Sequence, residues 1–114
     1  MSQPTTIDIK LQMLHSNFIN TTLGLKYLNN NKTLYLKILD NFTKRYESVN
    51  FYELKEEELK RTIHTIKGLT STLGMEPLYS SILEFENNNN DISMSNCCEN
   101  LFLTIDFINN LNYL

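Results

Sequence analysis

Apolar side chains recur at steps of three and four residues along most of the sequence, which is the spacing of one face of an α-helix. The clearest series lies in the middle of the chain and consists of Leu59, Ile63, Ile66, Thr70 and Leu73. The 114 residues include only 3 glycines and 2 prolines, too few for a sheet with many tight turns. The pattern therefore predicts a single all-α domain.

Four long segments carry an apolar stripe of this kind. The predicted helices run from about Thr33 to Val49, from about Lys55 to Gly74, from the turn containing Pro77 to the run Asn87–Asn90, and from about Ser95 to Leu111 or Asn112. Outside the middle segment, the expected core residues are Leu34, Tyr35, Ile38, Leu39, Phe42, Leu78, Ile82, Phe85, Cys98, Leu101, Phe102, Ile105 and Ile108. Because the connections are short, the four amphipathic helices predict an antiparallel four-helix bundle.

One or two short extra helices are expected before this bundle. Residues 1–6 are expected to be linker-like, and residues 7–18 to form either a short helix or an extended arm. A short helix capped by Thr21 or Thr22 should follow and end at Asn29–Asn31, since asparagine tolerates the left-handed conformation that closes a helix. The expected organisation is an N-terminal linker or short helix over residues 1–17 and the bundle over residues 18–114.

Composition argues against several classes of function. The net charge is −3 and no dense cluster of Lys or Arg is present, so nucleic acid is not expected as a partner. No glycine-rich phosphate loop is visible, so the chain is not expected to bind ATP. No apolar run could span a bilayer and no signal peptide is recognised, which favours a cytoplasmic protein without direct membrane contact. The adjacent Cys97 and Cys98 are expected to be reduced thiols, with no metal site.

The middle helix has a second face that differs from its apolar stripe. His64, Lys67, Gly68 and Ser71 share that face at helical spacing. A glycine inside a helix costs roughly 0.5–1 kcal/mol relative to alanine, so its position beside a histidine needs a reason. We expect another molecule to approach this face closely.

The residues of this face, together with Gly74, resemble the signature of histidine-containing phosphotransfer (HPt) domains, which is His-x-x-Lys-Gly with a further glycine ten residues after the histidine. The resemblance extends over about residues 18–111. Its other matches are Leu25-x-x-Leu28, Leu39-x-x-Phe42, Leu78 and Glu86.

The resemblance implies a role for each residue of the face. His64 would be the phosphorylated nucleophile, relaying a phosphoryl group between aspartates of response-regulator receiver domains in a two-component phosphorelay. Lys67 would contact the phosphoryl oxygens, Gly68 would admit the receiver, and the small Ser71 would donate a hydrogen bond to phosphate. Glu86 would accept a hydrogen bond from His64 Nδ1.

The resemblance also implies what surrounds the domain. The domain would be monomeric, would need no cofactor of its own because magnesium belongs to the receiver, and would be a module of a hybrid sensor histidine kinase.

Several alternatives remain open from the sequence. Each residue of the face is also compatible with an ordinary solvated surface, and His15 is expected to be a partly exposed surface histidine. The chain is also compatible with the phosphoacceptor domain of a chemotaxis-type histidine kinase, which uses the same His-x-x-Lys-Gly pattern. A helical interaction module that carries no phosphate is the third possibility.

Overall fold

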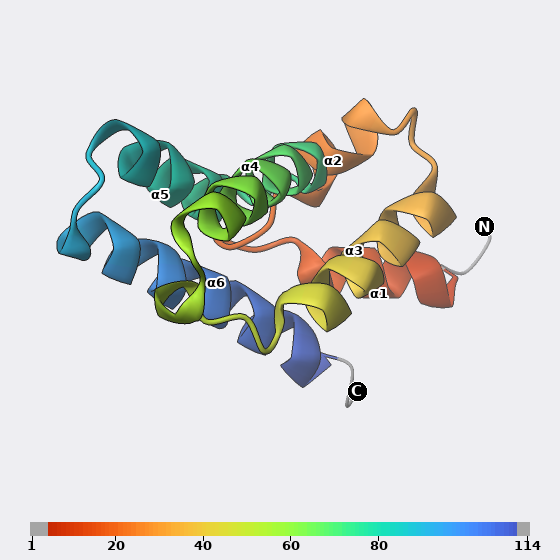
Figure 1. Cartoon of the computed structure of the whole chain (residues 1–114). Coiled ribbons are helices and arrows are strands. Elements are labelled where there is room, and N and C mark those ends of the chain that lie inside the picture. Colours follow the sequence, from red (N-terminus) through yellow and green to blue (C-terminus); the bar gives the residue numbers. More distant parts are fainter. Residues whose placement is uncertain (1–4, 112–114) are drawn as a thin grey trace.

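Helices make up most of the backbone in the computed structural model, which describes residues 5–111 (Figure 1). The six α-helices in this range are α1 (Thr6–Leu14), α2 (Thr21–Tyr27), α3 (Lys32–Tyr46), α4 (Glu56–Leu73), α5 (Glu76–Asn87) and α6 (Asp91–Leu111). A single 3-10 turn, η1 (Phe51–Glu53), connects α3 to α4. No strand occurs within the described residues, and the prediction of an all-α fold is confirmed.

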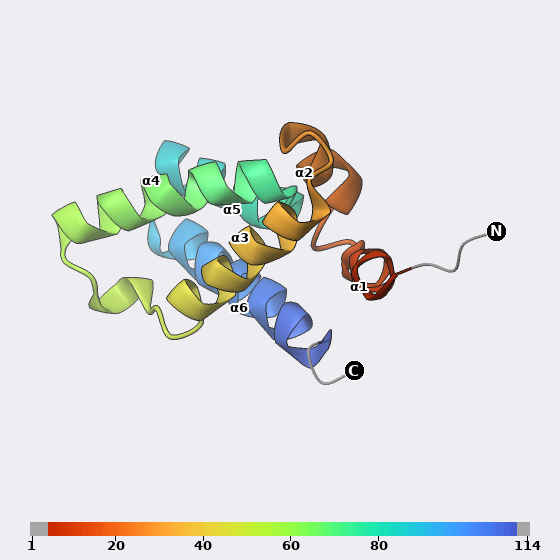
Figure 2. The same cartoon turned by 90° about the vertical axis from the view of Figure 1, so that its right-hand side faces the viewer.

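The helices pack around one continuous apolar core. Helix α4 contacts α2, α3 and α5, whereas α6 contacts α1, α3 and α5. Figures 1 and 2 both show α4 and α6 on opposite sides of the molecule, with α3 between their levels in the turned view. The largest fully buried side chains are Tyr35, Phe42, Phe51, Leu14, Ile19, Ile66, Leu73, Met75, Leu78 and Ile82.

Helix α4 has the bounds that the sequence predicts. Three glutamates occupy its first turn, where the helix dipole stabilises negative charge. Its predicted apolar stripe faces the core, with Leu59 partly buried and the other four members fully buried. The helix ends at Gly74, whose φ of 78° is the left-handed conformation that glycine adopts without strain.

The C-terminal end of α4 is held by close backbone contacts. The Asn20 N–H donates a hydrogen bond to the Gly74 carbonyl at 2.7 Å. The buried Tyr35 hydroxyl donates to the Leu73 carbonyl, also at 2.7 Å. Gly24 lets α2 come this close, because a Cβ at this position would lie 2.7 Å from the Leu73 oxygen. Gly24 and Gly74 are therefore both required by packing.

The N-terminal segment forms a helix, whereas the sequence was compatible with either a short helix or an extended arm. Residues 6–14 form α1, whose N-cap Thr5 and Asp8 complete a capping box. Phe18 follows the helix, and its ring packs against Phe107 of α6 with centroids 5.3 Å apart. The N-cap of α2 is Asn20 and not Thr21 or Thr22, since the Asn20 side chain accepts a hydrogen bond from the Leu23 N–H.

The two asparagine runs lie at helix ends, one as predicted from the sequence and one in a different way. Asn29 and Asn30 adopt φ values of 52° and 59°, as expected for residues that close a helix in the left-handed region. The last helix begins at Asp91, one turn before the predicted Ser95, because Asn90 accepts a hydrogen bond from the Ser93 N–H at 2.9 Å. Part of the run Asn87–Asn90 thus belongs to helix ends.

Three further expectations need correction. Helix α3 ends at Tyr46, before the predicted Val49. Leu34 and Phe102 were expected in the core, yet 40% and 67% of their surface is exposed. Neither side chain is a member of the buried core cluster. Asn112, the alternative end of the last predicted helix, lies outside the described residues.

Candidate functional site

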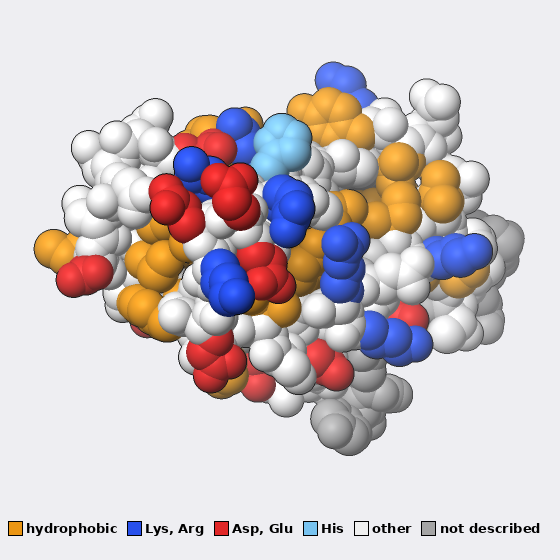
Figure 3. All heavy atoms as spheres, in the orientation of Figure 1, with side chains coloured by type: hydrophobic (Ala, Val, Ile, Leu, Met, Phe, Trp, Pro, Cys, Tyr) orange, Lys and Arg blue, Asp and Glu red, His pale blue; other side chains and the backbone are white. Residues whose placement is uncertain are grey.

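The second face of α4 is open to solvent. His64, Gly68 and Ser71 are exposed and Lys67 is half-buried, whereas Ile63 and its stripe lie against the core. Figure 3 shows a histidine side chain that protrudes over α4, with basic and acidic side chains beside it. The predicted separation of the helix into a buried apolar face and an exposed polar face is therefore confirmed.

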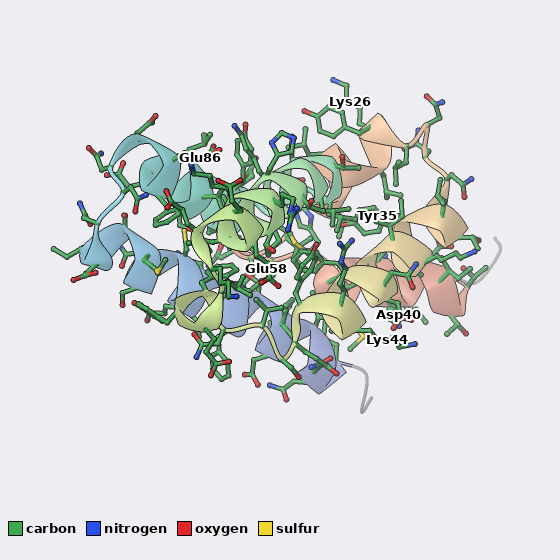
Figure 4. All side chains as sticks on the ribbon, in the orientation of Figure 1. Lys26, Tyr35, Asp40, Lys44, Glu58 and Glu86 are labelled. Atoms are coloured by element: carbon green, nitrogen blue, oxygen red, sulfur yellow. The ribbon has the colours of Figure 1, made fainter. Side chains whose placement is uncertain are left out.

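Lys67 forms an ion pair with α5. Its Nζ donates to Glu86 Oε1 at 2.9 Å, and about one third of each side chain is exposed. Figure 4 shows Glu86 on α5 beside the α4 ribbon. The hydrogen bond and the negative charge of Glu86 hold the pKa of Lys67 above its ordinary value, so the Lys67 side chain is positively charged at neutral pH.

The partner of Glu86 differs from the expected one. Among the hydrogen bonds of residues 5–111, none joins Glu86 to His64; the carboxylate instead accepts from Lys67. The long lysine side chain reaches across to α5, and a hydrogen bond between two charged groups is stronger than one between neutral groups. His64 and Glu86 nevertheless line the same groove between α4 and α5, which encloses about 360 Å³.

The groove contains a residue that the sequence analysis missed. Lys60 lines it together with His64 and lies one turn earlier on the same helix, paired with Glu56 at 3.6 Å. The four-residue spacing to His64 was the signal that could have identified it. Lys60 is therefore the cationic group of the groove beside the imidazole, while Lys67 follows His64 one turn later on the same helix.

Gly68 differs from the other two glycines of the chain. A Cβ at Gly68 would meet nothing within 4 Å, while one at Gly24 or Gly74 would collide with backbone atoms. The helix is continuous there, since Gly68 lies inside the α-helix Glu56–Leu73. Packing among residues 5–111 thus gives no reason for a glycine at position 68.

The remaining nucleophilic groups lie away from this face. His15 is exposed as predicted, and its Nδ1 accepts a hydrogen bond from the Thr21 N–H at 3.1 Å, which ties it to the start of α2. Cys97 and Cys98 are free thiols, as predicted. Burial raises the pKa of Cys97 to about 11. Among the imidazole and thiol groups of the described residues, His64 is therefore the one that lies exposed on the second face of α4.

Comparison with protein-family models, curated proteins and solved structures gives no match for this chain. None of the helices within residues 5–111 combines the length and apolar character that crossing a bilayer requires. The same part of the chain contains no group of three or more His, Cys, Asp or Glu side chains placed to hold a metal ion.

Proposed function

We propose that this chain is a histidine phosphotransfer domain that relays a phosphoryl group between receiver-domain aspartates in a two-component phosphorelay. The observation that carries the proposal is the exposed His64 with Lys67 one turn away and Gly68 open beside it. A glycine that the fold does not need, next to an accessible nucleophile, is what the close approach of another protein requires.

In this proposal the helices α3 to α6 form an antiparallel four-helix bundle within the domain assigned to residues 18–114, and α1 and α2 are the extra short helices before it. The contacts support that arrangement, because α3 packs on α4, α4 on α5, α5 on α6, and α6 again on α3. Such a bundle supplies a rigid helix on which the histidine is presented.

The chemistry places few demands on the bundle. The lone pair of His64 Nε2 forms the N–P bond as the acyl-phosphate P–O bond of the donor breaks, and the receiver's carboxylate leaves. The proton on Nδ1 takes no part in this step and stays available for a hydrogen bond. The magnesium that neutralises phosphoryl charge comes with the receiver, so the chain itself needs no cofactor.

Lys67 would stabilise the equatorial oxygens of the transferring group. Its ammonium is already fixed over α4 by Glu86, so it must exchange part of that ion pair for the phosphoryl group. Ser71 is exposed one further turn along and can donate its hydroxyl to a phosphoryl oxygen. Glu86 borders the groove beside His64 and can receive the Nδ1 hydrogen bond once Lys67 turns away.

The partners in this proposal are response-regulator receiver domains. The chain would act as a monomeric cytoplasmic module of a hybrid sensor histidine kinase, without membrane or nucleic-acid contact. A phosphoacceptor domain of a chemotaxis-type kinase would present its histidine in the same way, but it would take its phosphate from ATP bound to another domain.

Phosphotransfer from labelled receivers tests the proposal. The purified protein should acquire an acid-labile, alkali-stable label from phosphorylated receivers of the same genome and return it to an unlabelled receiver. His64→Gln should abolish labelling, while His15→Gln should not, since both histidines are exposed and only one lies on the proposed face. Labelling by ATP alone, or an unchanged label on His64→Gln, would refute the proposal. Transfer only from an ATP-bound kinase domain would favour the chemotaxis-type alternative.

A further inference from the structure

A second hollow lies away from the His64 groove and shares no residue with it. It is bounded by the end of α3, the segment around η1 and the C-terminal half of α6, and it encloses about 430 Å³. Tyr46, Leu101 and Ile105 line it and are at least 95% buried. This volume lies within the range of sites that accept a large side chain or a small ligand.

Two aromatic side chains stand exposed at this hollow. Tyr52 has 59% and Phe102 has 67% of its surface in water, although both border an apolar floor. Aromatic residues in such positions are the usual anchors of protein–protein contacts, because they bury much area with few rotatable bonds. The sequence pattern predicts that Phe102 is buried, and its exposure beside this hollow is what a contact with another protein would explain.

One residue that lines the hollow carries an unsatisfied polar group. The hydroxyl of Tyr46 is buried and has no hydrogen-bond partner among the described residues, and only 4% of the residue is exposed. A buried hydroxyl without a partner is uncommon in folded proteins and calls for an explanation. Because this hydroxyl is inaccessible to solvent, an incoming group would reach it only after the side chains around it move.

The charges at the rim indicate what kind of partner fits. Among the described residues that line the hollow, Glu47 and Asp106 are charged and none is Lys, Arg or His. Arg45 lies just outside the lining, with its guanidinium carbon 5.2 Å from the centre of the Tyr46 ring. A second copy docked face to face would bring carboxylates against carboxylates, which opposes self-association. A segment with basic residues beside its apolar anchor would meet complementary charge instead.

We propose that this hollow docks an amphipathic segment of another protein, in which an apolar or aromatic anchor is flanked by Lys or Arg. Tyr52 and Phe102 enclose the anchor over the floor of α6, and Glu47 and Asp106 pair with the flanking cations. The site is independent of His64, so a partner bound here leaves the α4 face free.

A designed peptide tests this proposal directly. The probe is a helical peptide of about 14 residues with leucines every three to four positions and lysines elsewhere. Titrated into the ¹⁵N-labelled full chain, it should shift amide resonances around residues 46–52 and 98–109 with saturation. A twin peptide with glutamate in place of lysine should not bind. Shifts spread over the whole surface, no saturable shift, or equal binding of the twin would overturn the proposal.

Matched variants distinguish binding at the hollow from nonspecific binding to exposed apolar side chains. Phe102→Ser should weaken peptide binding about tenfold or more. Ile92→Ser removes a side chain that is 75% exposed on the same helix but outside the hollow, and should leave binding unchanged. Equal loss in both variants would overturn the site. In sedimentation we expect a monomer; a dimer abolished by Phe102→Ser and kept by Ile92→Ser would assign the hollow to a second copy and refute a basic partner.

Discussion

Replacing each of two helical glycines by alanine should have opposite effects on stability. Gly68 and Gly24 both lie inside helices, so alanine gains roughly 0.5–1 kcal/mol of helix propensity at either position. At Gly68 the new methyl group meets nothing within 4 Å, and the full gain should appear. For a domain of this size, Gly68→Ala should raise the melting temperature by about 2–5 °C.

At Gly24 the same methyl group has no room. It would lie 2.5 Å from Cε2 of the buried Tyr35 ring and 2.7 Å from the Leu73 carbonyl oxygen. Overpacking of this kind costs about 1–3 kcal/mol, which exceeds the propensity gain. Gly24→Ala should therefore lower stability by about 0.5–2 kcal/mol.

Thermal and urea unfolding followed by far-UV circular dichroism measure both changes. A destabilised Gly68→Ala protein would show that the α4 face is packed, and the argument for an approaching partner would fail. The proposed docking of a receiver is tested with a larger side chain. Gly68→Gln should keep the fold and strongly slow phosphoryl exchange with receivers. Phosphorylation by small phosphodonors should be much less affected, because they need no docking surface. Parental exchange with receivers in Gly68→Gln would show that docking occurs elsewhere.

Three other predictions follow from the side-chain contacts. Glu86→Gln should lower the pKa of Lys67 towards its ordinary value of 10.5, as measured by NMR titration of the lysine side chain. Because the ion pair raises that pKa, its contribution to stability is present at neutral pH and is lost as the pH rises above 10.5. An unchanged titration would place Glu86 elsewhere in solution. Asn90→Ala should destabilise the fold by about 1 kcal/mol in urea unfolding through loss of the α6 cap; no change would contradict the early start of that helix. Cys98→Ser should react more slowly with a thiol reagent at pH 8 than Cys97→Ser, because burial leaves Cys97 largely protonated; the reverse order would contradict this packing.

Much of α4 could be predicted from the sequence alone. Its length, its acidic first turn, its end at Gly74 and its two faces all follow from spacing along a single helix. The all-α class follows in the same way. These properties are local, since a helix of 3.6 residues per turn fixes which side chains share a face whatever the helix later packs against.

The ends of the helices were predicted less well for a different local reason. Asn20, Thr21 and Thr22 are all acceptable caps, as are Asn90 and Ser95, and sequence preference hardly separates them. The structure selects Asn20 and Asn90 because their side chains reach the N–H three residues on.

Only the tertiary structure decided the partner of Glu86, the exposure of Phe102 and the difference between Gly24 and Gly68. Each depends on contacts between segments that are separated in the sequence. Lys67 of α4 pairs with Glu86 of α5, Phe102 of α6 borders the turn after α3, and a side chain at Gly24 would collide with Tyr35 and Leu73. Periodicity shows which face of a helix can be buried, but it carries no information on which neighbour covers that face. The site on α4 thus has its residues set by local spacing, and its charge pairing set by how closely α5 packs beside it.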